Sequence, residues 1–367
     1  MGVAKTGTTY LQRILYSRRE QLKAHGVLYP GDGPADQYMG SLDLRGESEG
    51  IYADRPVAGS WDTIVAEVRG CASDVVISHE TLARCTPAQI QRLLDSFPGM
   101  EFRVVLTVRD LGRQIPAVWQ EMLKNRQTMG YAEFLRHVLG EAKTQTNQYF
   151  WRVQDVARLA QRWGKIVGPE KLTIVTVPPR RDGDELWTRF AVATGLDRVP
   201  MVLPTVAHNP SLGPAEAELL RRLNRALPID LPWPRYHGSI KRQFVEGRLA
   251  SRDTGRIGIP EQWHPEVQKR SADMLELLTL AHYPVVGDLE ELTPVLELRA
   301  GGTPETLTQE QLIDTAVEVL AAELLRPPPA TPTTPAATSR LPLAVRRARL
   351  WSRRIRQGLT ARLPEGR

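Results

Sequence analysis

The chain has 367 residues and a formal net charge of +6, with 41% hydrophobic and 25% charged residues. These proportions are those of an ordinary globular protein, so they exclude a collagen-like, wholly disordered or disulfide-dense chain. No uncharged apolar stretch approaches the roughly 18 residues that cross a bilayer, and the first residues lack a signal-peptide pattern, so we expect a cytoplasmic protein.

The positive charge is concentrated at the C-terminus. Residues 340–367 contain nine arginines and one glutamate, a net charge of +8, which leaves about −2 for residues 1–339. A nearly neutral main part gives no indication of a nucleic-acid partner. Cys71 and Cys85 lack the spacing of a disulfide framework or a zinc site, and we expect two buried thiols.

Helices and strands alternate in the first half of the chain. Apolar periodicity predicts helices over residues 8–25 and 60–69. A β-branched run predicts a buried strand over residues 74–80, and Thr86 followed by Pro87 is typical of the start of a helix.

The same order then repeats. Residues 101–109 predict a strand, and the next helix carries an apolar stripe from Ile115, with Pro116 expected in its first turn. A long helix over residues 147–163 leads into a predicted strand over residues 171–177.

This alternation predicts an α/β fold of three layers, in which a central parallel sheet is flanked by helices. The strands that end at Glu80, Arg109 and Val177 should be parallel and adjacent or nearly so. Beyond residue 183 no further strand is indicated, and the pattern is mainly helical, with helices expected over residues 184–194, 214–227, 266–282 and 308–325.

Three regions follow from this pattern: an α/β domain over residues 1–326, a proline-rich linker over residues 327–339, and a tail over residues 340–367. The linker has five prolines and no charge. The tail has an apolar stripe opposite its arginines, which predicts a basic amphipathic helix that binds anionic lipid at the inner membrane face. A solvated or partner-docked helix is the alternative.

Lys5-Thr6-Gly7-Thr8-Thr9 directly precedes the first predicted helix. Helix N-termini present unpaired N–H groups, and a glycine lets the backbone wrap an anion closely, so this loop predicts a phosphate site. It is not a Walker A loop, because Lys5 precedes Gly7 instead of following the second glycine. A plain threonine-capped helix is the alternative.

On these residues the chain resembles the sulfotransferases that use 3′-phosphoadenosine 5′-phosphosulfate (PAPS), whose Lys-[ST]-Gly-Thr-[TS] loop binds the 5′-phosphosulfate. That family also has a strand that ends in an arginine and grips the 3′-phosphate, and Val104 to Asp110, with Arg109, has this form. The wider runs at residues 109–121, 186–190 and 209–213 look like the bacterial, actinobacterial-type branch.

The resemblance implies a P-loop-like fold, PAPS as co-substrate and no metal. Two departures stand out: Ala117 replaces a serine that many relatives use on the 3′-phosphate, and Met1 lies only four residues before Lys5, where the family has a full strand. We therefore expect an upstream extension that supplies this strand. An ion pair with Asp110 is the alternative role for Arg109.

His79 and Glu80 end a predicted strand, where ligands of open α/β sheets bind, so either is a candidate general base. We favour Glu80, because neighbouring strand residues point to opposite faces and a carboxylate is already ionised at neutral pH. A helix cap or a salt bridge is the alternative. Residues 237–248, with Lys241 and Arg242, are expected to close over the cofactor phosphates, or else to form an exposed basic helix.

The sequence thus predicts a PAPS-dependent sulfotransferase that acts on a hydroxyl or amine of a small-molecule, carbohydrate or lipid acceptor. A P-loop kinase or NTPase, and a catalytically inactive nucleotide-binding protein at the membrane, are the alternatives.

Overall fold

The computed structural model describes residues 1–47, 55–179, 184–204, 211–252, 254–296 and 302–325. The chain divides into a unit of residues 1–320, which contains the strands of both sheets, and a second unit of residues 321–367. The predicted linker and tail lie outside the described residues, as does part of the run at residues 209–213.

The first half contains the helices α1 (Thr8–Ser17), α2 (Arg19–Ala24), α3 (Asp36–Leu44), α4 (Ser60–Arg69), α5 (Pro87–Asp95), α6 (Leu111–Lys124), α7 (Tyr131–Leu139), α8 (Gln145–Gln154), α9 (Val156–Val167) and α10 (Glu185–Thr194). The second half contains α11 (Pro214–Ala226), α12 (Trp233–Arg235), the π-helix η4 (Tyr236–Glu246), α13 (His264–Leu280) and α14 (Gln309–Leu324). Short 3₁₀ helices are η1 (Glu80–Arg84), η2 (Pro169–Lys171), η3 (Leu196–Arg198), η5 (Leu249–Ser251), η6 (Glu261–Trp263), η7 (Leu289–Leu292) and η8 (Pro304–Thr306).

Three parallel strands form the main sheet. β3 (Val104–Val108) pairs along its whole length with β4 (Leu172–Thr176), and β5 (Val285–Val286) pairs with β4. On the other edge of β3, Gly2 forms a parallel bridge with Thr107. The parallel pairing predicted for β3 and β4 is confirmed. The prediction of no further strand is wrong, because β5 is too short to leave a pattern.

A separate pair of strands, β1 (Val27–Leu28) and β2 (Asp74–Val75), is also parallel. The strand predicted over residues 74–80 is therefore much shorter, and its partner is β1 instead of β3. The chain stays extended to His79 (φ −147°, ψ 143°), whose side chain caps η1. This cap starts a 3₁₀ turn at Glu80 and ends the extended segment.

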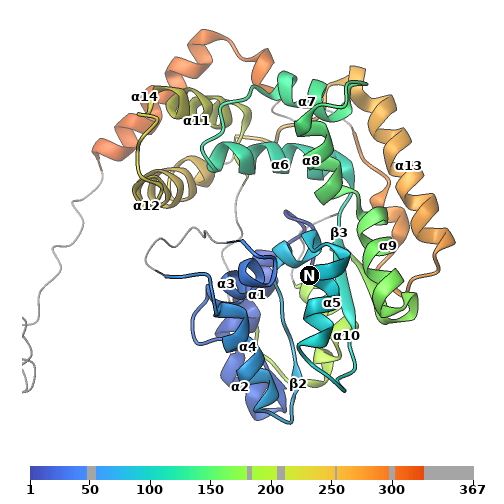
Figure 1. Ribbon diagram of the computed structural model, residues 1–367. Helices are drawn as coiled ribbons and strands as arrows, with labels where there is room; N and C mark the ends of the chain where they lie inside the picture. Colours follow the sequence, from blue (N-terminus) through green and yellow to red (C-terminus); the bar gives the residue numbers. More distant parts are fainter. Residues whose placement is uncertain (48–54, 180–183, 205–210, 253, 297–301, 326–367) are drawn as a thin grey trace, which may run out of the picture. The chain divides into compact units, whose positions relative to one another are not determined.

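Helices cover both faces of β3, whose successive residues point to opposite sides. Val104, Leu106 and Val108 are buried in one core cluster with residues of α5 and α9, and Val105 is buried in another with residues of α1 and α10. Figure 1 shows α5, α9 and α10 around this strand. The loop before α1 is thereby held against the carboxyl end of β3.

Two predicted long helices are each broken by one residue. Arg18 (φ −111°, ψ 13°) separates α1 from α2 within the helix expected over residues 8–25. Asp155 separates α8 from α9 within the helix expected over residues 147–163, because its carboxylate accepts the backbone N–H of Arg158 and caps α9. Such caps redirect the chain without a glycine or proline signal.

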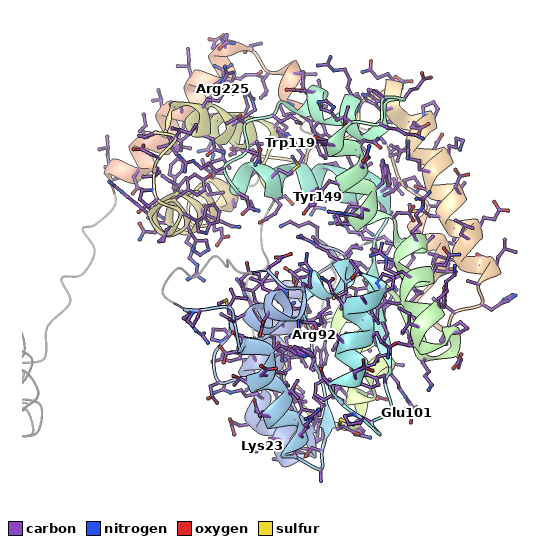
Figure 2. All side chains as sticks on the ribbon, in the orientation of Figure 1. Lys23, Arg92, Glu101, Trp119, Tyr149 and Arg225 are labelled. Carbon is purple, nitrogen blue, oxygen red and sulfur yellow. The ribbon has the colours of Figure 1, made fainter. Side chains whose placement is uncertain are left out.

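Helix α6 begins earlier than predicted. Asp110 is its N-cap and accepts the backbone N–H of Arg113 at 3.0 Å. Pro116 therefore lies in the second turn and not the first. The apolar face of α6 is confirmed: Ile115 and Trp119 are fully buried in a core cluster with α7, α8, α11 and η4 (Figure 2).

Candidate functional site

The loop before α1 makes a tight turn onto the helix. Lys5 (φ 73°) and Gly7 (φ 83°) both have left-handed backbone conformations. Gly7 is the N-cap of α1, and among the described residues no side chain caps this helix. A Cβ at Gly7 would overlap Leu186. The first N–H groups of α1 thus adjoin a glycine turn and a lysine, an arrangement suited to an anion.

Side chains from β3 and α6 hold this loop in place. The Thr6 hydroxyl donates to the Val3 carbonyl and lies 2.7 Å from the Thr107 hydroxyl. The Gln114 amide donates to the Ala4 carbonyl. Thr6 is fully buried, so its hydroxyl stabilises the loop. Thr8 and Thr9 lie in the first turn of α1. Thr8 is buried and Thr9 is exposed.

Arg109, at the end of β3, reaches the loop directly. Its Nη1 donates to the Lys5 carbonyl at 3.2 Å, which joins the two segments that the sequence singles out. Asp110 is engaged with Arg113, by a guanidinium ion pair as well as by the cap. Ala117 lies partly exposed in the second turn of α6.

One carboxylate of α6, Glu121, takes two ammonium groups. Lys5 donates to its Oε2, and Lys241 of η4 donates to its Oε1 at 2.9 Å. Burial alone raises the pKa of Glu121, but the charges and hydrogen bonds of these lysines outweigh it and lower the pKa to about 2. We call Lys5, Glu121 and Lys241 the lysine cluster.

Sequence reasoning did not assign Glu121 a role. The available signal was the Glu121, Lys124 and Asn125 spacing, which puts the three on one helical face. Lys241 contacts Glu121, and η4 is a π-helix and not an ordinary exposed helix. Arg242, its neighbour, is exposed. Long π-helices are rare and often occur at functional sites.

His79 and Glu80 form the second part of the site, which we call the strand-end pair. The expectation that the two side chains point to opposite faces requires strand geometry at both residues, and this does not hold because η1 starts at Glu80. His79 Nε2 lies 3.8 Å from Glu80 Oε2, and Gln12 of α1 donates to the same oxygen at 3.0 Å. Glu80 is thereby placed beside α1 and its loop.

The strand-end pair is partly buried, which affects the pKa of both side chains. Burial lowers the pKa of His79, so its ring is neutral at pH 7. Burial alone raises the pKa of Glu80, but His79, the Gln12 hydrogen bond and the charge of Lys5 lower it. The backbone N–H of Thr81 donates to His79 Nδ1 at 3.3 Å. In a neutral ring the proton is then on Nε2, the nitrogen that faces Glu80.

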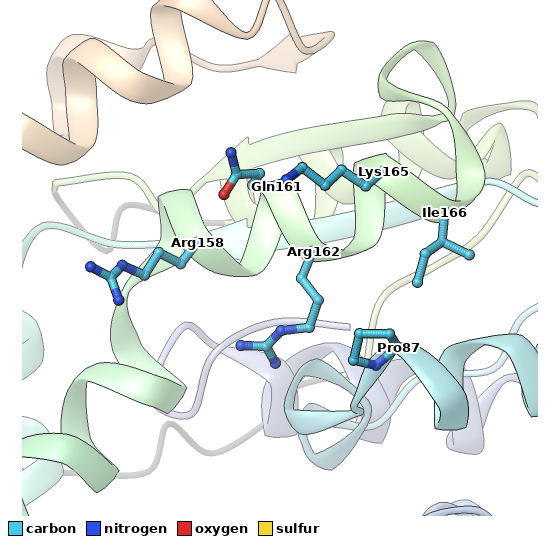
Figure 3. Close-up of a pocket in the computed structure, with 6 residues that line it drawn as sticks. All are labelled: Pro87, Arg158, Gln161, Arg162, Lys165 and Ile166. Carbon is cyan, nitrogen blue, oxygen red and sulfur yellow. The ribbon is translucent and has the colours of Figure 1, made fainter.

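A hollow elsewhere on the surface is lined by Pro87 and by residues of α9 (Figure 3), namely Arg158, Gln161, Arg162, Lys165 and Ile166. None of the predicted site residues lines it. Within the described part of the chain, no group of three His, Cys, Asp or Glu side chains is placed to hold a metal, and no helix is both long and apolar enough to span a membrane.

Comparison with known proteins adds little. No family model and no curated protein matches the chain. Among solved structures, it is similar to the crystal structure of a sulfotransferase from Alicyclobacillus acidocaldarius, with 16% sequence identity and a TM-score of 0.37, over 57% of this chain and 83% of that one. A similarity this distant carries no argument about function, which therefore has to be argued from the site.

Proposed function

We propose that the chain is a sulfotransferase that uses PAPS as its donor. The observation that carries this proposal is the contact between Arg109 and the Lys5 carbonyl, two residues 104 positions apart. It unites a lysine-glycine loop at a helix N-terminus with a strand-end arginine, and these are the two parts that a donor with phosphate at both ends requires. Helices on both faces of β3 agree with this proposal.

The residues present fit such a donor. Lys5, the backbone of Gly7, and Thr8 and Thr9 would hold the 5′-phosphosulfate at the N-terminus of α1, where the helix dipole favours an anion. Arg109 would hold the 3′-phosphate with its planar guanidinium fork. Lys241 and Arg242 would contribute from η4, which Lys241 already fastens to the site through Glu121.

The chemistry assigned to these side chains is a displacement at sulfur. The donor supplies the sulfuryl group: a bond from the acceptor oxygen or nitrogen to sulfur forms, and the bond from sulfur to the bridging oxygen breaks. Lys5 would stabilise the negative charge that develops on the bridging oxygen. Glu80 would accept the acceptor's proton, and His79 would keep the Glu80 carboxylate in position. This scheme uses no metal.

The acceptor class stays a prediction: a small molecule, a carbohydrate or a lipid with a hydroxyl or amine. Binding of the basic tail to an anionic membrane also stays a prediction, because residues 340–367 lie outside the described part. Sedimentation with anionic vesicles of the full chain, but not of a chain that ends at residue 326, is the expected result. Equal sedimentation of both would contradict it.

Ligand-dependent melting tests the donor. Adenosine 3′,5′-bisphosphate should raise the melting temperature without magnesium, and ATP with magnesium should not. Arg109→Ala should remove most of this shift. Arg103→Ala is the matched control, because Arg103 is exposed (78%) just before the same strand. Labelled PAPS incubated with an extract of metabolites should then yield a labelled product.

The reverse pattern, stabilisation by ATP with magnesium alone, would point to a kinase or NTPase. Stabilisation by adenosine 3′,5′-bisphosphate with no transfer to any acceptor would point to an inactive nucleotide-binding protein.

A further inference from the structure

The lysine cluster joins three elements through one carboxylate. Lys5 comes from the loop before α1, Glu121 from α6 and Lys241 from η4, and their side chains are only 22%, 26% and 16% exposed. One turn further along α6, Asn125 accepts from Lys241 at 2.8 Å and donates to Glu121 at 3.2 Å. Lys241 therefore has two partners on α6, whereas the recorded ion pair of Lys5 is with Glu121.

A third lysine lies close to this carboxylate. Lys124, which follows on α6, is 3% exposed, and burial and then the charge of Lys5 lower its pKa to about 8. At pH 7 three lysines thus act on one another and on the carboxylates of Glu121 and Glu246. Three ammonium groups this close together repel one another, and that repulsion favours the entry of a further anion.

We propose that Glu121 is a built-in competitor of the donor: its carboxylate holds Lys5 in the unloaded protein, and the phosphosulfate takes Lys5 over when it binds. Glu121 is then a positioning residue, because it acts through Lys5 and Lys241. This inference rests on the proposed function and assigns the same site a means of selecting its ligand.

Charge explains the selection. A carboxylate carries one negative charge, whereas a phosphosulfate or a phosphate pair carries more, so it competes for the Lys5 ammonium group where a singly charged anion does not. Lys241 keeps its contacts with Glu121 and Asn125 during the exchange, so η4 stays attached to α6. When the product leaves, Glu121 recaptures Lys5, which speeds release.

Isothermal titration with adenosine 3′,5′-bisphosphate tests this exchange. Glu121→Gln keeps the shape of the side chain and removes the competing charge. Its Kd should fall about fivefold, the change that corresponds to one partly exposed ion pair, and the ligand should dissociate correspondingly more slowly. A purely structural role for Glu121 predicts the opposite, because loss of an anchor weakens binding.

Glu246→Gln is the matched control. Glu246, like Glu121, acts on the charge of Lys124, but it forms no ion pair with Lys5 among the contacts described. Its removal should therefore change the Kd by less than twofold. Equal tightening by both variants would reduce the effect to general charge and overturn the proposal, as would a Kd for Glu121→Gln that is unchanged or higher.

If Glu121→Gln does not fold, Glu121→Asp gives the same comparison. The aspartate side chain is one methylene shorter, so its carboxylate lies farther from Lys5. Its Kd should fall about twofold, and weaker binding would again overturn the proposal. Failure of the natural chain itself to bind adenosine 3′,5′-bisphosphate is a different outcome, because it contradicts the proposed function and not the competition alone.

Discussion

The lysine cluster and the strand-end pair lie on either side of the same loop, yet they hold their carboxylates in different ways. Glu121 is held by two full charges, Lys5 and Lys241. Glu80 is held by a neutral amide, that of Gln12, and faces a histidine that burial keeps neutral. Both carboxylates are partly buried, with 26% and 27% of the side chain exposed, so burial does not distinguish them.

The difference suits two different tasks. A carboxylate that bridges two ammonium groups has little tendency to take a proton, and its pKa of about 2 expresses this. The pKa of Glu80 is also lowered, in part by the charge of Lys5, but the hydrogen bond described for its carboxylate comes from the Gln12 amide and not from an ammonium group, which suits an oxygen that receives a proton from an acceptor. The comparison therefore assigns ion pairing to Glu121 and proton transfer to Glu80, and substitutions in the two groups of residues test that assignment.

The largest expected effect is that of Glu80→Gln. It removes basicity and keeps size, so turnover should fall on the order of a hundredfold or more, with the Kd for adenosine 3′,5′-bisphosphate nearly unchanged. His79→Asn should be milder, because His79 only positions the carboxylate. Steady-state turnover and titration calorimetry measure the two quantities. If His79→Asn abolishes transfer and Glu80→Gln does not, the roles are exchanged.

Lys124 tests the burial of charge beside the cluster. Burial is the main reason that its pKa is about 8, against an ordinary value of 10.5. Below pH 8 the lysine is charged in both states, and this charge is less favourable in the folded protein than in the unfolded chain. Between pH 8 and 10.5 the unfolded state binds more protons, and stability should rise with pH. The free energy of unfolding of the natural chain should therefore rise by about 3 kcal/mol across this window, relative to that of Lys124→Met. Denaturant unfolding of both proteins below and above the window measures this change. A pH-independent difference would mean that the pKa of Lys124 is not lowered.

Lys5→Ala tests the role of the cluster in turnover. Because the proposed partner of Lys5 is charge that develops during transfer, turnover should fall on the order of tenfold or more, while product Kd rises less. Lys23→Ala, in the exposed part of α2 (Figure 2), is the control and should change neither. Equal losses in turnover and product binding would make Lys5 an anchor for the ground state only.

The smallest effect concerns the amide that holds Glu80. Gln12→Leu removes a hydrogen bond that lowers the pKa of this carboxyl. Glu80 must be ionised to accept a proton, so the acid limb of the turnover profile should move to higher pH, by about half a unit. The position of that limb, measured against pH in both proteins, checks the prediction. A shift to lower pH would mean that Gln12 does not favour the ionised form.

The sequence predicts those parts of the fold that local patterns determine. The central strands β3 and β4, the capped start of α5 and the loop before α1 all follow from short runs of residues. The breaks at Arg18 and Asp155 do not: at Asp155 a single cap decides the break, and at Arg18 the backbone of one residue leaves the helical conformation. The short strand β5 and the pairing of β2 with β1 depend on tertiary contacts. Hydrophobic periodicity in the sequence does not indicate such contacts.

The site was predictable in the same measure. The two motifs predict that Lys5 and Arg109 lie close together, and in the structure Arg109 donates a hydrogen bond to the Lys5 carbonyl. Glu121 was missed because its partners are 116 and 120 residues away. The side-chain directions of His79 and Glu80 could not be predicted, because the 3₁₀ turn of η1 starts where the expected strand would have continued.

The supports of the loop before α1 also determine when it can form during synthesis. Its carbonyls at Ala4 and Lys5 depend on Gln114 and Arg109, which follow 110 and 104 residues later. Closing such long segments is entropically costly and becomes favourable only when β3 and α6 exist to dock against. At roughly 5 to 20 residues per second, the ribosome needs roughly 5 to 20 s to deliver them. Until then the newly made loop has none of these supports, and a chaperone or the ribosome surface is what it meets first.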